Sequence, residues 1–163
     1  MIVIEGGIRI KSVNMDDPGL EELFRDSSAS IYLSETRMYT GNMPAVMRFA
    51  IQKENQLIGE VSLRNIKWYN RKAELSIFIA DKYQGKGYGK NALLGVIKYA
   101  FETMNFYRLE AEVLDYNDRA KTMIEKMGFI PEGRLRQAKY YEGKYYDILR
   151  YGILKSEYDE KYK

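Results

Sequence analysis

The first part of the chain carries short apolar patterns broken by polar residues. Apolar and polar side chains alternate over residues 8–13, which predicts a first strand. The run Asp16-Asp17-Pro18 predicts a helix start, because acidic side chains and proline are favoured in a first helical turn. A second helix is expected over about residues 31–38, followed by a loop through residues 41–42.

Three apolar segments separated by short polar turns come next, at residues 46–52, 57–65 and 73–79. Connections this short join antiparallel neighbours, so the segments are predicted to form an antiparallel meander. In the third strand, period-two alternation divides the side chains between the two faces of the sheet. One face carries Leu75, Ile77 and Ile79, and the other carries Glu74, Ser76 and Phe78.

The hydrophobic period changes beyond residue 83. Apolar residues recur at helical spacing over residues 93–104, and then alternate with charged residues over 109–113. The pattern therefore predicts a helix followed by a half-buried strand. A further helix is predicted to start at a cap on Asn117 or Asp118 and to stop at Gly128.

The last segments complete a mixed α/β fold of the α+β type. Two Tyr-rich segments, 135–141 and 144–154, flank Glu142-Gly143 and predict a hairpin. The charged tail, 155–163, is expected to fray or to form a short helix. Residues 1–163 are thus expected to form a single domain, in which a central sheet with an antiparallel N-terminal meander and a C-terminal hairpin is flanked by helices.

The composition excludes several kinds of chemistry. The chain has no Cys and no His, so it can build neither a disulfide, nor a thiolate nucleophile, nor a Ser-His-Asp arrangement. A zinc site is not expected either, and no metal is predicted. Proton transfer would have to use Asp, Glu, Tyr, Lys, Ser or water.

Charge and hydropathy give little indication of a macromolecular partner. The net charge is only +3, which is too small to indicate nucleic acid. No run of about 18 apolar residues suggests a membrane span, and the first residues lack the pattern of a signal peptide. A soluble, cytoplasmic protein is therefore expected.

The glycine-rich segment 84–89, Gln-Gly-Lys-Gly-Tyr-Gly, joins a strand to a helix. Its glycines allow backbone N–H groups to turn toward an anion at the helix N-terminus, and a pyrophosphate fits such a site. The alternative is a tight turn without a ligand, because short glycine motifs are weak signals. A Walker A loop and a dinucleotide-binding loop both fit poorly, since the first lacks its hydroxyl residue and the second its glycine spacing.

The same segment resembles the Gln/Arg-x-x-Gly-x-Gly/Ala motif of the GCN5-related N-acetyltransferases (GNAT). The resemblance extends to Ala73-Glu74-Leu75-Ser76-Ile77 before the loop and to residues 116–120, 125–129 and 132–133 after it, and covers about 46–154. The subgroup looks like the RimJ/RimL-type ribosomal-protein acetyltransferases, with spermidine acetyltransferases close by.

This resemblance implies acetyl-CoA as the acetyl donor. The loop and helix start would hold its pyrophosphate, the preceding strand would pair with its pantetheine arm where two strands splay apart, and a backbone N–H there would polarise the thioester. Asn117 would bind the arm or a water near the sulfur, and Lys121 or Arg119 could meet the 3′-phosphate. The implied cofactor-binding residues are Ile77, Phe78, Ile79, Gln84, Gly85, Lys86, Gly87, Tyr88, Gly89, Lys90, Asn117 and Lys121.

The sequence departs from the family at the general acid. Many members place a Tyr four residues before the Gly of a Gly-Phe pair. This chain has Ile124 at that position, and Ile124 is predicted to be a core residue. Asn117 with water, or Tyr140 or Tyr141 of the hairpin, would have to replace it. Alternatively, the thiolate leaves without help from an acid.

A carboxylate is expected to take the proton of the acceptor amine. Glu74, on the strand before the loop, is the first candidate, and Glu60 on the neighbouring strand is the second. Both residues could equally be ordinary solvent-facing sheet carboxylates. Close placement of amine and thioester could supply much of the rate without either of them.

Three functions stay open from the sequence. The first is acetyl transfer to a primary amine such as a protein N-terminus, and the second is acetylation of a polyamine, amino sugar or antibiotic. The third is a CoA-binding module without catalysis. The Tyr-rich hairpin could line a substrate groove, or it could pack in the sheet or form the surface of a homodimer.

Overall fold

The computed structural model describes residues 2–3, 9–10, 13–14, 17–26 and 43–163. The described residues belong to two compact units, 1–39 and 40–163. The predicted second helix at 31–38 lies outside the described residues, and the single-domain organisation stays a prediction.

The first unit contains a two-stranded ladder and one helix. β1 (Ile2–Val3) and β2 (Arg9–Ile10) pair antiparallel, and β2 falls within the first predicted strand. α1 (Pro18–Asp26) begins where the sequence predicts a helix start. Asp17 Oδ1 accepts a hydrogen bond from the Leu20 N–H at 3.0 Å, so an acidic side chain directly before the proline caps the first turn.

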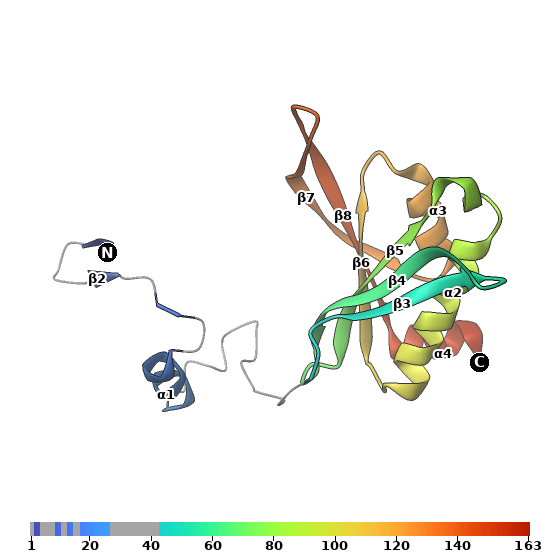
Figure 1. Cartoon of the computed structure of the whole chain (residues 1–163). Coiled ribbons are helices and arrows are strands. Elements are labelled where there is room, and N and C mark those ends of the chain that lie inside the picture. Colours follow the sequence, from blue (N-terminus) through green and yellow to red (C-terminus); the bar gives the residue numbers. More distant parts are fainter. Residues whose placement is uncertain (1, 4–8, 11–12, 15–16, 27–42) are drawn as a thin grey trace. The chain divides into compact units, whose positions relative to one another are not determined.

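The second unit is built on a six-stranded sheet in the order β3-β4-β5-β6-β8-β7, and this confirms the predicted mixed α/β class (Figure 1). All neighbours pair antiparallel except β5 and β6, which are parallel. The strands are β3 (Met47–Lys53), β4 (Gln56–Lys67), β5 (Lys72–Ile79), β6 (Arg108–Leu114), β7 (Ile130–Tyr141) and β8 (Lys144–Leu154).

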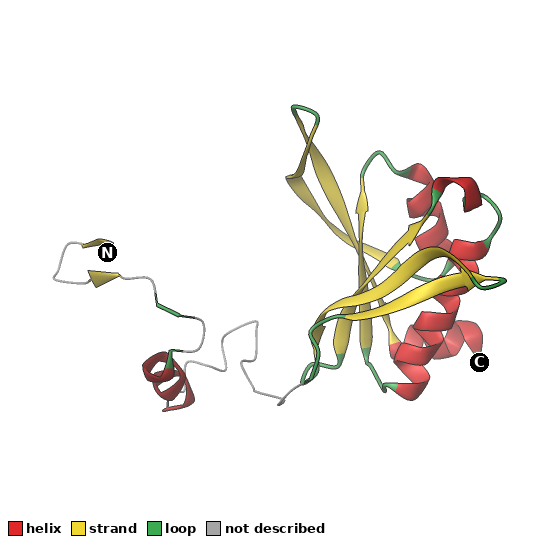
Figure 2. Cartoon of the chain, viewed as in Figure 1, coloured by secondary structure: helices red, strands yellow, loops and turns green. Residues whose placement is uncertain are grey.

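The helices of this unit gather on one side of the sheet (Figure 2). The crossover from β5 to β6 is made by a 3-10 turn, a helix and a π-helical turn, as a parallel pair requires. The bounds are η2 (Asp81–Tyr83), α2 (Tyr88–Lys98), η3 (Tyr99–Thr103), α3 (Asp118–Lys126) and α4 (Lys155–Tyr162). In the described part of the chain, no helix is long and apolar enough to cross a membrane.

The core lies between the sheet and these helices. Leu63 of β4, Leu109 of β6 and Ile97 of α2 are almost completely buried in one cluster. α3 adds Ile124, which is 5% exposed, and Met127 at the C-cap of the helix is buried as well. The apolar sides of the strands and helices that the sequence predicts therefore meet in this one core. Ile124 is a core residue, as expected.

The opposite face of the sheet is charged. Glu110 accepts hydrogen bonds from Lys72 at 3.0 Å and from Arg108 at 2.8 Å, and Arg108 also donates to Glu132 at 2.8 Å. Burial raises the pKa of Glu110, but hydrogen bonds from Arg108 and Lys72 outweigh burial, so the net shift is downward. Ion pairs thus link β5, β6 and β7 across this face.

Of the two expectations for the tail, fraying or a short helix, the structure shows the helix, because residues 155–162 form α4. The Glu157 carboxylate caps the helix by accepting the Leu154 N–H at 2.8 Å. Tyr158 is only 4% exposed, stacks on Phe101 with ring centroids 4.9 Å apart, and donates to Glu102 Oε1 at 2.8 Å. Tyr162, one turn later, also donates to the Met127 carbonyl at 2.9 Å, so two aromatic side chains dock an otherwise charged helix.

We predict that Tyr158→Phe lowers the free energy of unfolding by about 1 kcal/mol at pH 7, because the bond to Glu102 is lost while the ring stays. Burial first, and then the bond to Glu102, raise the pKa of Tyr158 from 10.0 to about 12. This stabilisation is complete below pH 10 and is lost as the pH rises toward 12. Urea unfolding should therefore show the difference between the two proteins narrowing over that interval. A difference that stays constant from pH 7 to pH 12 would contradict the assignment.

Candidate functional site

The glycine-rich loop is tied to the end of β5 by its first side chain. Gln84 Nε2 donates to the Ile79 carbonyl at 2.9 Å and to Asp81 Oδ1 at 3.1 Å. Gly85 and Gly87 follow with φ angles of 77° and 83°, which L-residues with a side chain rarely adopt. Gln84 therefore positions the loop, and the glycines allow its backbone to turn.

The first turn of α2 presents its backbone N–H groups to open space. Gly87 is the N-cap, no side chain caps the helix, and the Asn91 N–H makes the bond to the Gly87 carbonyl at 3.1 Å. The N–H groups of residues 88–90 precede this bond and have no intrahelical acceptor. A β-carbon on Gly87 would meet nothing within 4 Å, so an anion has room to approach.

A cavity of about 360 Å³ lies on the helix side of the sheet, where β5, the loop, α2 and the start of α3 meet. Ile77 and Ile79 supply its apolar wall, and the loop and α2 supply its polar end. Its lining consists of Ile77, Ile79, Tyr83, Gln84, Gly85, Gly87, Tyr88, Gly89, Lys90, Asn117, Arg119, Ala120 and Met123. The structure thus brings together most of the residues implied for cofactor binding.

A second cavity of about 470 Å³ adjoins the first, because the two share Lys90, Arg119 and Met123. Lys126 adds another cation, and Asp118 is the acidic residue of its lining. The Asp118 carboxylate is paired with the Lys121 ammonium at 2.6 Å. The adjoining cavity therefore has a basic wall suited to a further phosphate group.

Some residues implied for cofactor binding do not line the first cavity. Phe78 lies on the opposite face of β5 and is 66% exposed, and the Lys86 ammonium lies 5.8 Å from the Tyr83 ring. Lys121 donates to the Asp115 carbonyl at 2.7 Å, which holds the start of α3. Arg119 is instead the basic residue of α3 in the cavity wall.

Sequence reasoning did not single out Tyr83, Ala120 and Met123 as lining residues. Tyr83 directly precedes the motif, and Ala120 and Met123 are spaced i, i+3 on α3. Both α3 residues lie on the apolar stripe of the helix, and both also pack against the core. The stripe is therefore wide enough to serve the core and the cavity wall, and helical periodicity alone does not separate these roles.

Asn117, and not Asp118, caps α3, so the first of the two predicted caps is confirmed. Its Oδ1 accepts the Ala120 N–H at 3.1 Å, and the residue lines the cavity. The two donors of a carboxamide reside on its nitrogen, so Nδ2 is the group that Asn117 can offer to a ligand.

The two parallel strands separate beside this cavity. The register of β5 with β6 ends at the pair Leu75 and Ala111, although β5 continues to Ile79 and β6 to Leu114. β5 stays paired with β4 as far as Ile79, whereas β6 stays paired with β8 as far as Leu114. Figure 1 shows β5 and β6 diverging toward the end where the loop and α3 begin. We call the opening beyond Leu75 and Ala111 the splay.

The two carboxylates predicted as bases lie on the charged face, across the sheet from the cavity. Glu74 accepts a hydrogen bond from Asn65 Nδ2 at 3.0 Å. Glu60 accepts from Arg48 Nε at 2.9 Å, and this bond is the main cause of the lowered pKa of Glu60. A lower pKa makes Glu60 a weaker proton acceptor.

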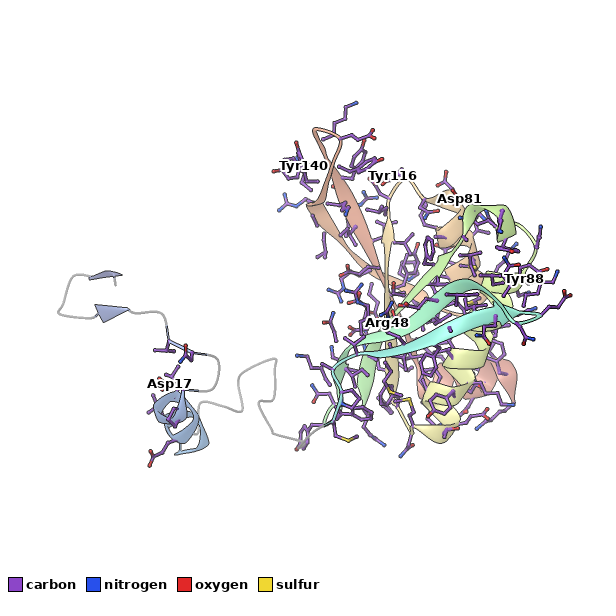
Figure 3. The ribbon with its side chains drawn as sticks, viewed as in Figure 1. Asp17, Arg48, Asp81, Tyr88, Tyr116 and Tyr140 are labelled. Carbon is purple, nitrogen blue, oxygen red and sulfur yellow. The ribbon has the colours of Figure 1, made fainter. Side chains whose placement is uncertain are left out.

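The two phenols predicted as substitute acids lie away from the lining of the cavity. Tyr140 and Tyr141 are exposed near the tip of the β7–β8 hairpin, and Figure 3 shows Tyr140 apart from Tyr88 of the cavity. A hydrogen bond to Glu142, and then burial, raise the pKa of Tyr141. Neither residue lines the cavity, so their acid role stays a prediction without support from this geometry.

Comparison with known proteins gives the family. Residues 17–130 match the family described as the acetyltransferase (GNAT) domain. The chain belongs to the GNAT acetyltransferase family. Among solved structures, variant forms of the spermidine/spermine N-acetyltransferase SpeG from Vibrio cholerae match 90% of this chain and 81% of theirs, with a TM-score of 0.71 and 30% identity.

Curated relatives of this GNAT chain have more than one acceptor in their names. The putative ribosomal N-acetyltransferase YdaF of Bacillus subtilis is 34% identical over 65% of this chain and 58% of its own length. The spermidine N(1)-acetyltransferase of Vibrio cholerae is 34% identical over 70% of this chain and 66% of its own. The chain therefore spans between 58% and 66% of the length of these two relatives.

We predict that Gly87→Glu lowers the affinity for coenzyme A at least about 100-fold, or about 2.8 kcal/mol, because it adds a negative charge at the N-terminus of α2. Isothermal titration calorimetry measures the change. Gly143→Glu is the matched control, because Gly143 also has a positive φ of 78° and free space around its β-carbon but lies in the hairpin turn. Equal affinities of both variants and the unsubstituted protein would contradict the site.

Proposed function

We propose that the protein transfers an acetyl group from acetyl-CoA directly to a primary amine. The observation that carries this proposal is the cavity that runs from the N-terminus of α2 to the splay. Its polar end fits a pyrophosphate, and its apolar wall of Ile77 and Ile79 leads to an open strand edge. A ligand with a charged head and an extended amide arm matches both ends.

The donor is held mainly by the backbone. N–H groups of residues 85–90 bind the pyrophosphate, which needs no side chain and is favoured by the dipole of α2. The arm adds to β5 as a strand along residues 77–79, where β6 no longer pairs. Asn117 Nδ2 donates to the arm from the start of α3, and Lys90 and Arg119 face the phosphates from the cavity wall.

Donor and acceptor reach the splay from different faces of the sheet. The cavity lies on the helix face, whereas Glu60 and Glu74 point to the charged face. The amine can therefore meet the thioester in the opening between β5 and β6, without a covalent intermediate on the protein. The chain has no Cys or His to form such an intermediate by the usual routes.

Departure of the coenzyme A thiolate does not need a general acid at position 124. Ile124 is buried in the core and offers no proton. An alkyl thiol has a pKa of about 8.5, so its thiolate is a fair leaving group near neutral pH, and the proton lost from the attacking amine can neutralise it. The departure from the family at this position is therefore compatible with activity.

The acceptor is a single amine, such as a protein N-terminus, rather than a polyamine. The supporting observation is that most carboxylates on the described charged face have basic partners: Glu60 pairs with Arg48, and Glu132 pairs with Arg108, whereas Glu74 accepts from the neutral Asn65. A polyamine carries several positive charges and needs carboxylates in excess of such partners. Because one relative is named for ribosomal acetylation and another for spermidine, the choice between the two kinds of acceptor rests on these ion pairs.

The assembly proposed is a homodimer. β7 is an edge strand that is exposed along its whole length, and edge strands offer backbone groups to a second chain. Tyr140 and Tyr145 form an exposed pair near its tip, with ring centroids 5.1 Å apart. A SpeG structure from Vibrio cholerae is described as dodecameric, so a relative with this fold assembles into oligomers.

We predict that acetyl-CoA is turned over with Ser- or Ala-starting peptides and at least about tenfold less efficiently with spermidine, because of the paired carboxylates. Release of free thiol across an amine panel is the measurement. Higher efficiency with spermidine would overturn the proposed acceptor. Coenzyme A binding without turnover of any amine would overturn the enzymatic function and leave a binding module.

We predict that Arg119→Ala weakens coenzyme A binding about tenfold, or about 1.4 kcal/mol, because Arg119 lines both cavities. Lys121→Ala removes a neighbouring cation that lines neither cavity, and it should change the affinity less than threefold. Calorimetry on both variants decides between the two residues. A larger loss for Lys121→Ala would show that Lys121 contacts the ligand after all.

A further inference from the structure

The turn between β3 and β4 lies next to the first turn of α2. β3 ends at Lys53, which pairs with Gln56 of β4 across the two-residue turn Glu54-Asn55. Both turn residues have positive φ angles, of 50° and 67°, as a tight hairpin turn requires. The Lys53 ammonium lies 5.5 Å from the centroid of the Tyr88 ring, and Figure 3 shows Tyr88 beside the tip of this hairpin. An edge of the sheet therefore reaches the residue at which α2 begins.

Tyr88 connects Lys53 to the first cavity. The residue lines the cavity and directly follows Gly87, the N-cap of α2, so its backbone N–H is the first of those without an intrahelical acceptor. An ammonium group held over the Tyr88 ring therefore stands at the rim of the cavity, close to the N-terminus of α2. Lys53 does not itself line the cavity, but its long, flexible side chain can carry the ammonium across the rim without a change in the backbone.

The ammonium of Lys53 is available to a ligand. Within the described part of the chain, its side chain contacts the Tyr88 ring, and no carboxylate pairs with it. A cation–π contact at an exposed position is weak, whereas phosphate oxygens bind an ammonium both by charge and by hydrogen bonds. The ring thus holds a cation near the cavity, and a phosphate group bound there would attract that cation more strongly than the ring does.

The other tyrosine of the lining carries cations in the same way. The ammonium groups of Lys82 and Lys86 lie 4.9 Å and 5.8 Å from the centroid of the Tyr83 ring. Tyr83 and Tyr88 directly precede and follow segment 84–87, so lysines are held on the rings at both ends of the glycine-rich loop. Lys82 and Lys86 are in or near the motif in the sequence, whereas Lys53 is brought to the loop only by the fold.

We propose that Lys53 is a donor-binding residue whose ammonium exchanges the Tyr88 ring for the diphosphate of coenzyme A, an inference that rests on the proposed function. The backbone N–H groups of the loop bind the diphosphate, and Lys53 adds a positive charge from a separate element of the sheet. The diphosphate is the target because Tyr88 adjoins the loop, whereas Lys126 lines the adjoining cavity suited to a further phosphate. The ligand class is therefore a thioester carried on a nucleotide diphosphate.

The test is calorimetry of coenzyme A binding to Lys53→Gln. At an ionic strength of about 50 mM we expect the affinity to fall about fivefold, and at about 0.5 M the loss should shrink to within about twofold, because salt screens exposed charges. Glu54→Gln is the matched control, because it changes the charge of the same turn in the opposite sense, and its affinity should not fall. Lys53→Arg keeps the charge and should bind within about twofold of the unsubstituted protein.

Ligands with fewer phosphate groups locate the contact. Dephospho-coenzyme A keeps the diphosphate and lacks the 3′-phosphate, so Lys53→Gln should lose the same factor in affinity for it as for coenzyme A. S-acetylpantetheine lacks both groups, so its kcat/KM with a Ser-starting peptide should agree within about twofold between Lys53→Gln and the unsubstituted protein.

Unchanged affinity of Lys53→Gln for coenzyme A at low salt would overturn the inference and leave the proposed function standing. A loss with coenzyme A but not with dephospho-coenzyme A would also overturn it, because the contact would then be with the 3′-phosphate. An equal loss with S-acetylpantetheine would overturn it as well, because Lys53 would then only support the Tyr88 ring. Absence of coenzyme A binding by the unsubstituted protein would remove the donor site and this assignment together. Because calorimetry needs no acceptor amine, a failure of catalysis alone leaves the test of Lys53 intact.

Discussion

The early end of pairing between β5 and β6 is the constraint on which the site depends. β5 stays with β4 and β6 stays with β8, so the single parallel ladder of the sheet must open beyond Leu75 and Ala111. Opening a sheet exposes backbone groups that need new partners. An extended ligand arm supplies such partners, and the opening also connects the two faces. In the function proposed above, the helix face serves the donor and the charged face serves the acceptor.

The sequence predicted the elements well because their signals are local. Alternation defined the meander, and the glycine motif placed the loop between β5 and α2. The tail was harder, because its buried ring, Tyr158, lies in a charged segment and stacks on Phe101, which is far away in the sequence. The docking of the tail depends on a tertiary contact between residues that no short stretch of the sequence contains together.

The roles of individual charged residues could not be predicted, because they depend on direction and register. Arg119 and Lys121 are two positions apart on α3, so they point to different sides, and only Arg119 lines the cavity. Glu110 and Glu112 are two residues apart on the same face of β6, yet only Glu112 lies beyond the ladder. Strand alternation assigns a face but not the point at which two strands part.

The crystal structure of the protein with bound coenzyme A examines the splay most directly. The diphosphate should lie within hydrogen-bonding distance of the backbone N–H groups of residues 85–90, and the arm should run along residues 77–79 between β5 and β6. An arm that lies outside this opening, or a β6 that closes onto β5 when the ligand is bound, would contradict the central claim.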